Sequence, residues 1–134
     1  MAYKSYFPSA LGLITLTSNG KELTGLYFEG QKFAPNFEEY LEAPLEIFTK
    51  TKVYLVEHFN GNKPSFSLPL KPQGTDFQKL VWSSLITIPY GTTTTYGEIA
   101  KKVALKLGKS KMSAQAVGSA IAHNPICIVI PCHR

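Results

Sequence analysis

Few cysteines, a single aspartate and no long apolar runs characterise this 134-residue sequence. The two cysteines, Cys127 and Cys132, form no Cys-x-x-Cys pair, so the sequence offers neither the ligand set of a closed zinc site nor a disulfide framework. No aspartate precedes Asp76, and residues 1–72 hold no paired acid and base for catalysis. No apolar run approaches the roughly 18 residues needed to span a bilayer. These absences argue against a structural zinc domain, a disulfide scaffold and a membrane-spanning protein.

The N-terminal sequence and the small number of cysteines indicate the cellular compartment. The N-terminus, Met1-Ala2-Tyr3-Lys4, lacks the basic start and apolar middle of a secretory signal peptide. A chain with two cysteines and no export signal is expected in the reducing cytoplasm, where a cysteine remains a free thiol. A length of 134 residues, with 44% hydrophobic and 17% charged residues, suits one ordinary globular domain or two small ones.

The net positive charge comes entirely from the second half of the chain. Residues 1–74 carry seven lysines and seven glutamates and sum to zero. Residues 75–134 carry six lysines and Arg134 against Asp76 and Glu98, and sum to +5. This asymmetry favours a polyanionic partner for the second half. A lysine face that only aids solubility fits the charge alone equally well.

Residues 1–72 are predicted to form an α/β scaffold domain. Residues 3–7, 11–17 and 21–28 are rich in aromatic and β-branched residues, and Asn19-Gly20 indicates a hairpin, so three antiparallel strands are expected. Residues 31–43 are expected to be irregular, and residues 66–70 are a candidate strand. A helix is predicted over residues 45–59, and Gly61 is expected to terminate it. His58 is expected to be a surface residue near the end of this helix. Its expected buried stripe, with the Lys52 stem laid along it, is Leu45, Phe48, Lys52, Leu55, Val56 and Phe59.

Residues 73–134 are predicted to form a second domain of three helices. The boundary is the Pro/Gly break at Lys71-Pro72-Gln73-Gly74. Gln78 and Glu98 each follow a threonine at the spacing of a capping box. The expected N-caps and helices are Thr75 before residues 76–86, Thr95 before a helix with Ile99, Val103 and Leu107 on one buried face, and Ser113 before residues 114–123.

The last two predicted helices form a helix-turn-helix pattern. The lysines that crowd the earlier helix and the turn are Lys101, Lys102, Lys106, Lys109 and Lys111. The later helix has a small side that lets its backbone lie close to another surface, made of Ala114, Ala116, Gly118, Ser119, Ala120 and Ala122. Close helix packing explains the small residues taken alone. Beside the lysines, a nucleic-acid groove is the favoured partner.

The candidate nucleophile is Cys132, in Ile130-Pro131-Cys132-His133-Arg134. Residues 126–130 are strand-like in their β-branched content. Pro131 is expected to end that strand, so that Cys132 lies just beyond its end, where a substrate can reach it. A thiol reacts as thiolate, and a neighbouring imidazole or cationic group lowers its pKa. A buried structural cysteine is the commoner role for an isolated thiol, and it is the role expected of Cys127.

Four motifs in order carry a resemblance to a known family. They are Ile88-Pro89-Tyr90-Gly91, Tyr96-Gly97-Glu98-Ile99-Ala100, Ala116-Val117-Gly118 followed by Asn124-Pro125, and Ile130-Pro131-Cys132-His133-Arg134. With these motifs the sequence resembles the O6-alkylguanine-DNA alkyltransferases, also called methylated-DNA–protein-cysteine methyltransferases. The resemblance is dense over residues 75–134 and covers the first half in general layout.

The resemblance implies both a fold and a reaction. Residues 1–72 would form a ribonuclease-H-like α/β domain, and residues 73–134 an α-helical, helix-turn-helix (winged-helix-like) domain that binds the minor groove of double-stranded DNA. The reaction would be DNA repair: an O6-alkylguanine is flipped out of the duplex, and its alkyl group is transferred once to the protein's own cysteine, without metal or cofactor. O4-alkylthymine is a second candidate substrate, and a monomer is expected.

The same resemblance implies roles for individual residues. Cys132 would accept the alkyl group, His133 would relay the thiol proton through a water, and Tyr96 would donate towards the departing guanine. Asn124 would brace the segment that precedes Cys132. The residues implied at the DNA are Thr95, Tyr96, Ser113, Ala114, Gln115, Ala116, Gly118, Ser119, Ala122 and Arg134.

Two features depart from the family pattern. Many members carry an arginine finger on the third helix, where this chain has Gln115, a residue with hydrogen-bonding capacity but no charge and less reach. The family continues past Arg134 with a glycine-rich loop, a tyrosine and a glutamate that orients the histidine, so a truncated form is expected whose repair activity is open. Two alternatives remain. One is an alkyltransferase-like protein that binds alkylated DNA without repairing it; Cys132 argues against it, whereas Gln115 and the absence of the family's residues after Arg134 favour it. The other is a plain helix-turn-helix regulator, which leaves the cysteine segment unexplained.

Overall fold

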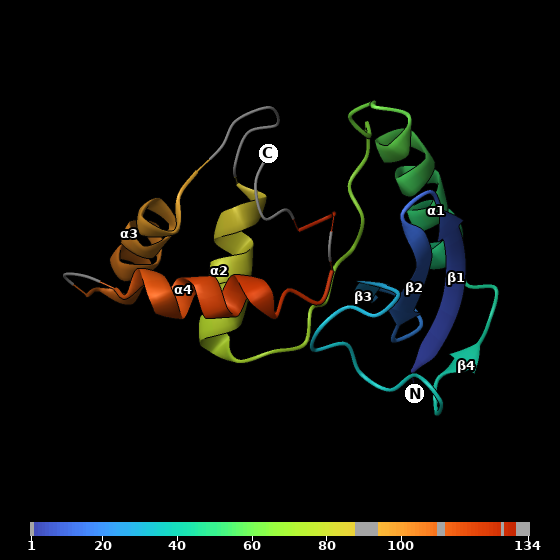
Figure 1. The fold of residues 1–134 in the computed structure, drawn as a ribbon, viewed down its shortest axis with the longest axis horizontal. Helices are drawn as coiled ribbons and strands as arrows, with labels where there is room; N and C mark the ends of the chain where they lie inside the picture. Colours follow the sequence, from blue (N-terminus) through green and yellow to red (C-terminus); the bar gives the residue numbers. More distant parts are fainter. Residues whose placement is uncertain (1, 88–93, 110–111, 127, 131–134) are drawn as a thin grey trace. The chain divides into compact units, whose positions relative to one another are not determined.

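The chain divides into two compact units, Met1–Pro72 and Gln73–Arg134. The computed structural model describes residues 2–87, 94–109, 112–126 and 128–130 (Figure 1). Within these ranges no helix has the length and apolar character that crossing a membrane requires.

A four-stranded sheet, in the order β3-β2-β1-β4, forms the base of the first unit as far as the structure describes it (Figure 1). The strands β1 (Tyr3–Ser9), β2 (Gly12–Ser18) and β3 (Leu23–Phe28) pair antiparallel, which confirms the predicted meander. The β2–β3 connection carries the expected turn signal, because Asn19 Oδ1 accepts hydrogen bonds from the backbone N–H groups of Lys21 and Glu22 at 3.0 and 2.9 Å.

Two expectations for the edges of this sheet were wrong. Within residues 31–43, expected to be irregular, Leu41–Glu42 forms the short strand β4, which pairs parallel with β1. Residues 66–70 form no strand: Leu70 makes only an isolated bridge to Leu23. Leu23 donates to the Pro69 carbonyl and accepts from the Lys71 N–H, both at 2.8 Å. Pro69 itself lacks an N–H group, so a regular ladder cannot continue through it.

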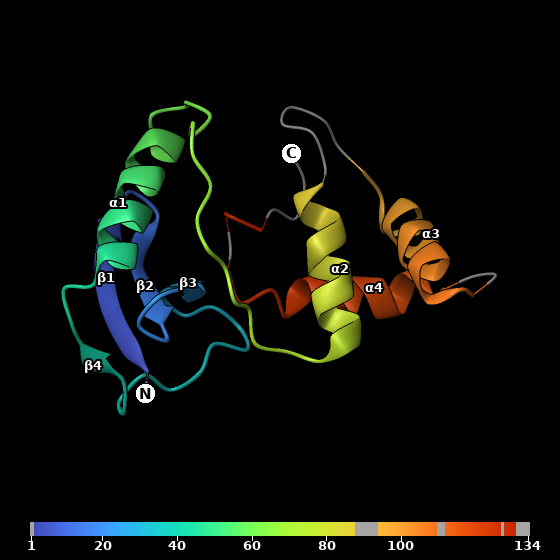
Figure 2. The ribbon, with the colours of Figure 1, turned by 180° about the vertical axis from the view of Figure 1, so that it is seen from behind.

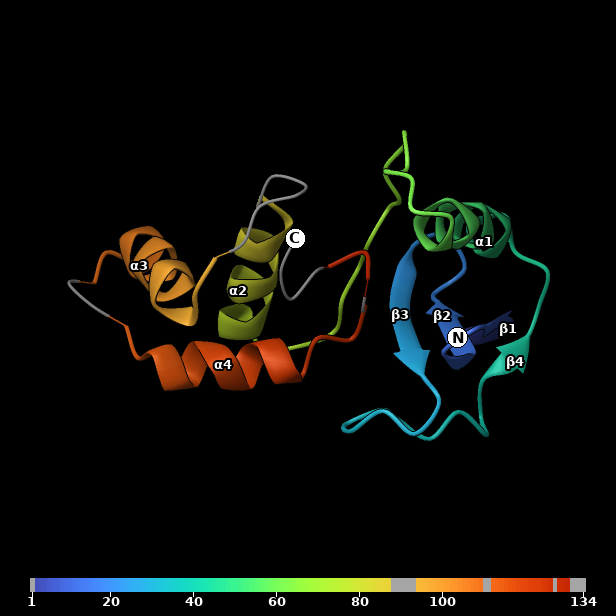
Figure 3. The same ribbon diagram turned by 45° about the horizontal axis from the view of Figure 1, so that its top comes forward.

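Helix α1 (Glu46–Phe59) packs against the sheet through β2 (Figures 2 and 3). The helix was predicted, but its buried face differs from the expected stripe. The side chains it buries are Ile47, Phe48, Thr51 and Leu55. Val56 is 48% exposed and Phe59 36% exposed. Thr51 is tolerated inside because its hydroxyl donates to the Ile47 carbonyl at 2.7 Å, which satisfies the polar group within the helix.

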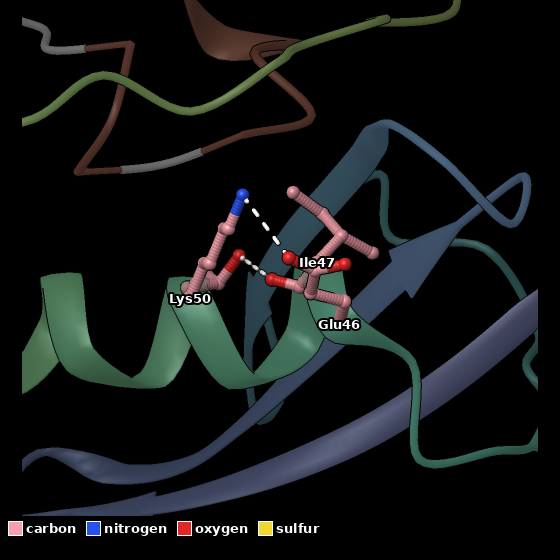
Figure 4. A network of polar contacts seen from close by, with 4 residues as sticks. Glu46, Ile47 and Lys50 are labelled. Carbon is pink, nitrogen blue, oxygen red and sulfur yellow. Dashed lines mark hydrogen bonds and ion pairs between the residues drawn. The ribbon is translucent and has the colours of Figure 1, made fainter.

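The ends and outer face of α1 follow ordinary helix chemistry. Gly61, with φ of +80°, terminates the helix as predicted: its N–H donates to His58, and the next N–H, of Asn62, donates to Glu57, both at 3.0 Å. On the outer face, Lys50 Nζ lies 3.4 Å from a carboxylate oxygen of Glu46 one turn earlier (Figure 4). His58 is exposed in the last turn, as expected.

The second unit contains the helices α2 (Asp76–Ile86), α3 (Tyr96–Leu107) and α4 (Ala114–Ala122), which pack against one another (Figures 1 and 3). All three predicted N-caps are confirmed. Thr75 and Gln78 form both hydrogen bonds of a capping box. Thr95 and Ser113 accept from the N–H groups of Glu98 and Ala116 at 3.1 and 3.2 Å.

The core of this unit lies where the three helices meet the segment after α4. Its fully buried side chains, each at most 1% exposed, include Val81, Trp82, Leu85, Ile99, Val103, Val117, Ile126 and Ile130. Ile99 and Val103 are buried as predicted, whereas Leu107 is 44% exposed. The chain turns at Gly108, with φ of +69°, immediately after Leu107, so the last turn of α3 ends before a neighbour covers that side chain.

Candidate functional site

Helix α4 separates a buried side from an open side. Val117, Ala120 and Ile121 are buried in the helical core. On the opposite side Gln115 and Ser119 are exposed, one helical turn apart. The other residues of α4 predicted at the DNA are Ala114 and Ala122, both exposed, and Ala116 and Gly118, both half-buried. The side chains on the outer surface of α4 therefore extend little from the helix, because most of them are no larger than a methyl or hydroxymethyl group.

Trp82 anchors this helix from within the core. Its indole N–H donates to the backbone carbonyl of Ala120 at 2.8 Å, and the side chain is 1% exposed. Ala120 also accepts from the His123 N–H at 3.2 Å at the end of α4. The indole therefore ties the C-terminal half of α4 to α2 by a directional contact as well as by apolar packing. The sequence alone does not reveal this bond, because its partner lies 38 residues away.

Tyr96 meets α4 at Gly118. Tyr96 is the first residue of α3, directly after the N-cap Thr95, and its side chain is 52% exposed. A Cβ atom built on Gly118 would lie 3.0 Å from Cε2 and 3.1 Å from Cδ2 of the Tyr96 ring. The structure thus brings two of the predicted site residues into contact, and the contact depends on the missing side chain of Gly118.

Asn124 braces the chain after α4 through its side-chain amide. Its Oδ1 accepts from the Ile126 N–H at 2.9 Å, and its Nδ2 donates to the Ile130 carbonyl. Asn124 is 3% exposed, and Ile126 and Ile130 are fully buried. One side chain therefore holds both ends of the segment that leads to Pro131.

The strand predicted over residues 126–130 is wrong. The N–H of Ile130 donates back to the carbonyl of Ile126 at 2.9 Å, which closes a turn. Ile128 has φ of +72°, a left-handed conformation that is strained for a β-branched residue. The two bonds of Asn124 stabilise this turn, whereas the β-branched composition alone suggested extended backbone.

Several predicted site residues lie outside the described residues. These are Cys132, His133 and Arg134, together with Cys127 and the motif Ile88-Pro89-Tyr90-Gly91. In the part of the chain that is described, no group of three or more His, Cys, Asp or Glu side chains is arranged to hold a metal ion.

A pocket of about 530 Å³ adjoins the start of α4, and sequence reasoning missed it. Its lining includes Lys101, Leu105 and Lys109 from α3 and the residues after it, with Met112 and Ala114 from the approach to α4. Lys106 lies elsewhere on α3, where its amine donates to Ser84 Oγ at 3.4 Å. Lys101 and Lys109 therefore place positive charge at the pocket, beside Ala114, the first residue of α4.

Comparison with known proteins covers both units. Residues 2–72 match the family model of the 6-O-methylguanine DNA methyltransferase ribonuclease-like domain, and residues 76–134 match that of the DNA-binding domain of the same family. A methylated-DNA–protein-cysteine methyltransferase of Haemophilus influenzae is 39% identical, over 98% of this chain and 72% of the relative. A protein of the same name from Methanosarcina acetivorans is 41% identical, over 98% of this chain and 81% of the relative.

Solved structures agree with these sequence matches. The crystal structure of the Mycobacterium tuberculosis O6-methylguanine methyltransferase superposes with a TM-score of 0.84 at 37% identity, covering 98% of this chain and 76% of that chain. The OGT of the same organism in complex with DNA matches with a TM-score of 0.83 at 36% identity, over 97% of this chain and 75% of that chain.

These matches confirm the predicted fold class, an α/β ribonuclease-like domain followed by a helical DNA-binding domain. They do so over nearly the whole chain and in both units. The chain belongs to the 6-O-methylguanine DNA methyltransferase family.

Proposed function

We propose that this chain repairs O6-alkylguanine in double-stranded DNA by transferring the alkyl group to Cys132. The thiolate sulfur of Cys132 attacks the alkyl carbon, a carbon–sulfur bond forms, and the bond between that carbon and guanine O6 breaks. Guanine leaves with the electron pair and takes up a proton. The thioether is stable, so each molecule acts once.

The observation that carries this proposal is the coincidence of family and nucleophile. Both units match the same methyltransferase family, and the chain has a cysteine in Ile130-Pro131-Cys132-His133-Arg134. A cysteine between proline and histidine has a base at hand for its proton. The alternative of a protein that binds alkylated DNA without repairing it leaves this thiol without a role.

Proton transfer is assigned to His133 and Tyr96. His133 takes the thiol proton through a water, and the Tyr96 hydroxyl donates a proton towards the departing guanine, which makes the base a better leaving group. Tyr96 suits this role because it stands in the first turn of α3 with its side chain half exposed and its ring against α4. Asn124 supports the same reaction by holding the turn that precedes Pro131 and Cys132.

DNA is bound through a helix-turn-helix arrangement of α3 and α4. The exposed side of α4 enters the minor groove, where its small side chains allow the backbone to come close to the base edges. The modified guanine is flipped out of the stack, because its O6 substituent is out of reach within the duplex. Gln115 fills the gap and hydrogen-bonds the orphaned cytosine. Lys101 and Lys109 add phosphate contacts beside this helix.

We place the protein in the cytoplasm as a monomer. A reactive thiol that must stay reduced until it meets damage requires a reducing compartment. O6-alkylguanine is the main substrate, and O4-alkylthymine, which carries its alkyl group on an equivalent oxygen, is a secondary one.

The test is intact-mass measurement after incubation with a duplex that contains O6-methylguanine. The expected result is a gain of one methylene mass, located on the peptide with Cys132 and limited to one per protein molecule. The matched controls are Cys132→Ser, which abolishes the gain, and Cys127→Ser, which retains it. If the duplex binds the protein but the mass does not change, the chain is a binding protein and the proposal is wrong.

A further inference from the structure

Gly118 is an unexpected residue for the interior of α4. Glycine is the least favourable residue in a helix interior apart from proline, because it carries the largest backbone entropy cost. Gly118 is the fifth residue of a nine-residue helix, and its φ lies outside the left-handed region that glycine alone adopts readily. Neither a turn nor a cap therefore explains it, and the reason must lie in what approaches its Cα atom.

The group that approaches Gly118 is the ring of Tyr96. A Cβ on Gly118 would stand 3.0 Å from Cε2, 3.1 Å from Cδ2 and 3.8 Å from Cζ of that ring. Optimal carbon–carbon contacts lie at about 3.5–4.0 Å, so two of these separations are too short. An alanine at position 118 would therefore require the edge of the phenol ring to shift by a few tenths of an ångström.

This contact sets where the Tyr96 ring stands on the open side of α4. Gln115 lies three residues before Gly118 and Ala122 four residues after it, so the three share one helical face. Tyr96 is 52% exposed, so about half of the residue's surface is open to solvent. Contact with the bare backbone at Gly118 therefore allows the ring to lie close against α4.

We propose that Gly118 is a positioning residue for Tyr96, holding the phenol ring against α4 at the place from which its hydroxyl serves the departing guanine. The inference rests on the proposed function, in which Tyr96 is the proton donor. A methyl group at position 118 pushes the ring away from α4 and displaces the hydroxyl. The loss then falls on the transfer step more than on DNA affinity.

The first experiment compares Gly118→Ala with Gly97→Ala. Both replace a helical glycine by alanine, but a Cβ at Gly97 would meet only Thr95 Oγ1, at an ordinary 3.7 Å. The readouts are the single-turnover rate of methyl transfer at saturating lesion duplex and the duplex concentration at half-saturation. Gly118→Ala is expected to slow transfer by about 3- to 10-fold, less than the roughly 100-fold cost of a 1 Å misplacement, because the ring has to shift by only a few tenths of an ångström. Half-saturation should change less than the rate, and Gly97→Ala should change neither by more than about twofold.

The second experiment repeats Gly118→Ala in a Tyr96→Ala background. If Gly118 acts through the ring, the second substitution slows residual transfer no further. If it slows transfer by the same factor with and without the ring, Gly118 acts on DNA directly and the proposal is overturned. A double-mutant cycle isolates this coupling.

Thermal unfolding tests the contact without any need for repair activity. The four proteins compared are the wild type, Gly118→Ala, Tyr96→Ala and the double variant. Alanine is a better helix former than glycine, so Gly118→Ala should raise the melting temperature of the protein in the Tyr96→Ala background. In the presence of the ring, this gain should be lost. An equal gain in both backgrounds overturns the proposal. Failure of the wild-type chain to acquire a methyl group on Cys132 would instead refute the proposed function, and the melting cycle would still decide the contact.

Discussion

The indole N–H of Trp82 on α2 donates a hydrogen bond of 2.8 Å to the carbonyl oxygen of Ala120 on α4. The bond lies in the core, with Trp82 1% and Ala120 3% exposed. It holds the helix that carries most of the proposed DNA contacts. The first prediction follows from it.

Trp82→Phe is expected to destabilise the second unit by about 2–4 kcal/mol, since it leaves a buried carbonyl with a weaker set of donors and opens a cavity. Amide hydrogen exchange followed residue by residue is the measurement. Exchange in α4 should accelerate, whereas amides of β1 and β2 in the first unit serve as an internal reference. Ser83→Ala, at the exposed neighbouring position on α2, is the matched control. Equal exchange in α4 for both variants would contradict the anchoring role.

The brace made by Asn124 predicts an unusual result for a conservative change. Asn124→Asp keeps the oxygen that accepts from Ile126 but replaces the donor to Ile130 by a second acceptor. It should therefore be no more stable than Asn124→Ala, with each costing about 2–3 kcal/mol in urea unfolding. Both variants should also transfer methyl groups more slowly. Asn62→Ala, at an exposed position in the first unit, is the reference, and an aspartate variant with wild-type stability would refute the brace.

The lysines at the pocket beside α4 predict a change in salt dependence. If Lys101 and Lys109 contact phosphates, each change to glutamine should reduce the slope of log affinity against log salt concentration by about 1. Fluorescence anisotropy with an undamaged duplex over a range of salt concentrations measures this slope. Lys50→Gln is the control, because Lys50 lies on α1 and pairs with Glu46 at 3.4 Å (Figure 4). A slope that changes equally in all three variants would indicate a non-specific charge effect.

Gln115 predicts that lesion binding can be strengthened. Gln115→Arg adds charge and reach on the exposed side of α4, so affinity for lesion duplex should rise by about 1 kcal/mol, or about fivefold. Ser119→Arg places the same charge one turn further along α4 and controls for electrostatics. The prediction requires a larger gain for position 115 with lesion duplex than with undamaged duplex. Unchanged affinity and transfer rate for Gln115→Arg would refute the idea that glutamine weakens binding.

Local signals in the sequence predicted the helix ends well. Thr75, Thr95 and Ser113 were each expected as N-caps, and Gly61 as the end of α1, and the structure confirms all four. Capping depends on atoms three or four residues apart, so a short stretch of sequence contains all the information.

Burial was predicted less reliably, because neighbours from elsewhere in the chain decide it. The expected stripe of α1 included Val56, whereas the sheet covers Ile47 and Thr51 instead. Hydrophobic content could not identify that face, since apolar side chains occur around much of the helix. The strand expected over residues 126–130 was wrong for a local reason: the side chain of Asn124 supplies hydrogen bonds that extended backbone would have sought from another strand.

The sequence by itself determined the chemistry proposed for this protein and its family. Cys132 beside His133 suggested a candidate nucleophile from residue type alone, and the resemblance of four motifs to a known family implied alkyl transfer from DNA and the role of Tyr96. Only the tertiary structure decided which of these residues touch. Tyr96 and Gly118 are 22 positions apart, and Trp82 and Ala120 are 38 apart. Contacts at such separations arise from the packing of three helices around one core, and no local spacing rule encodes them.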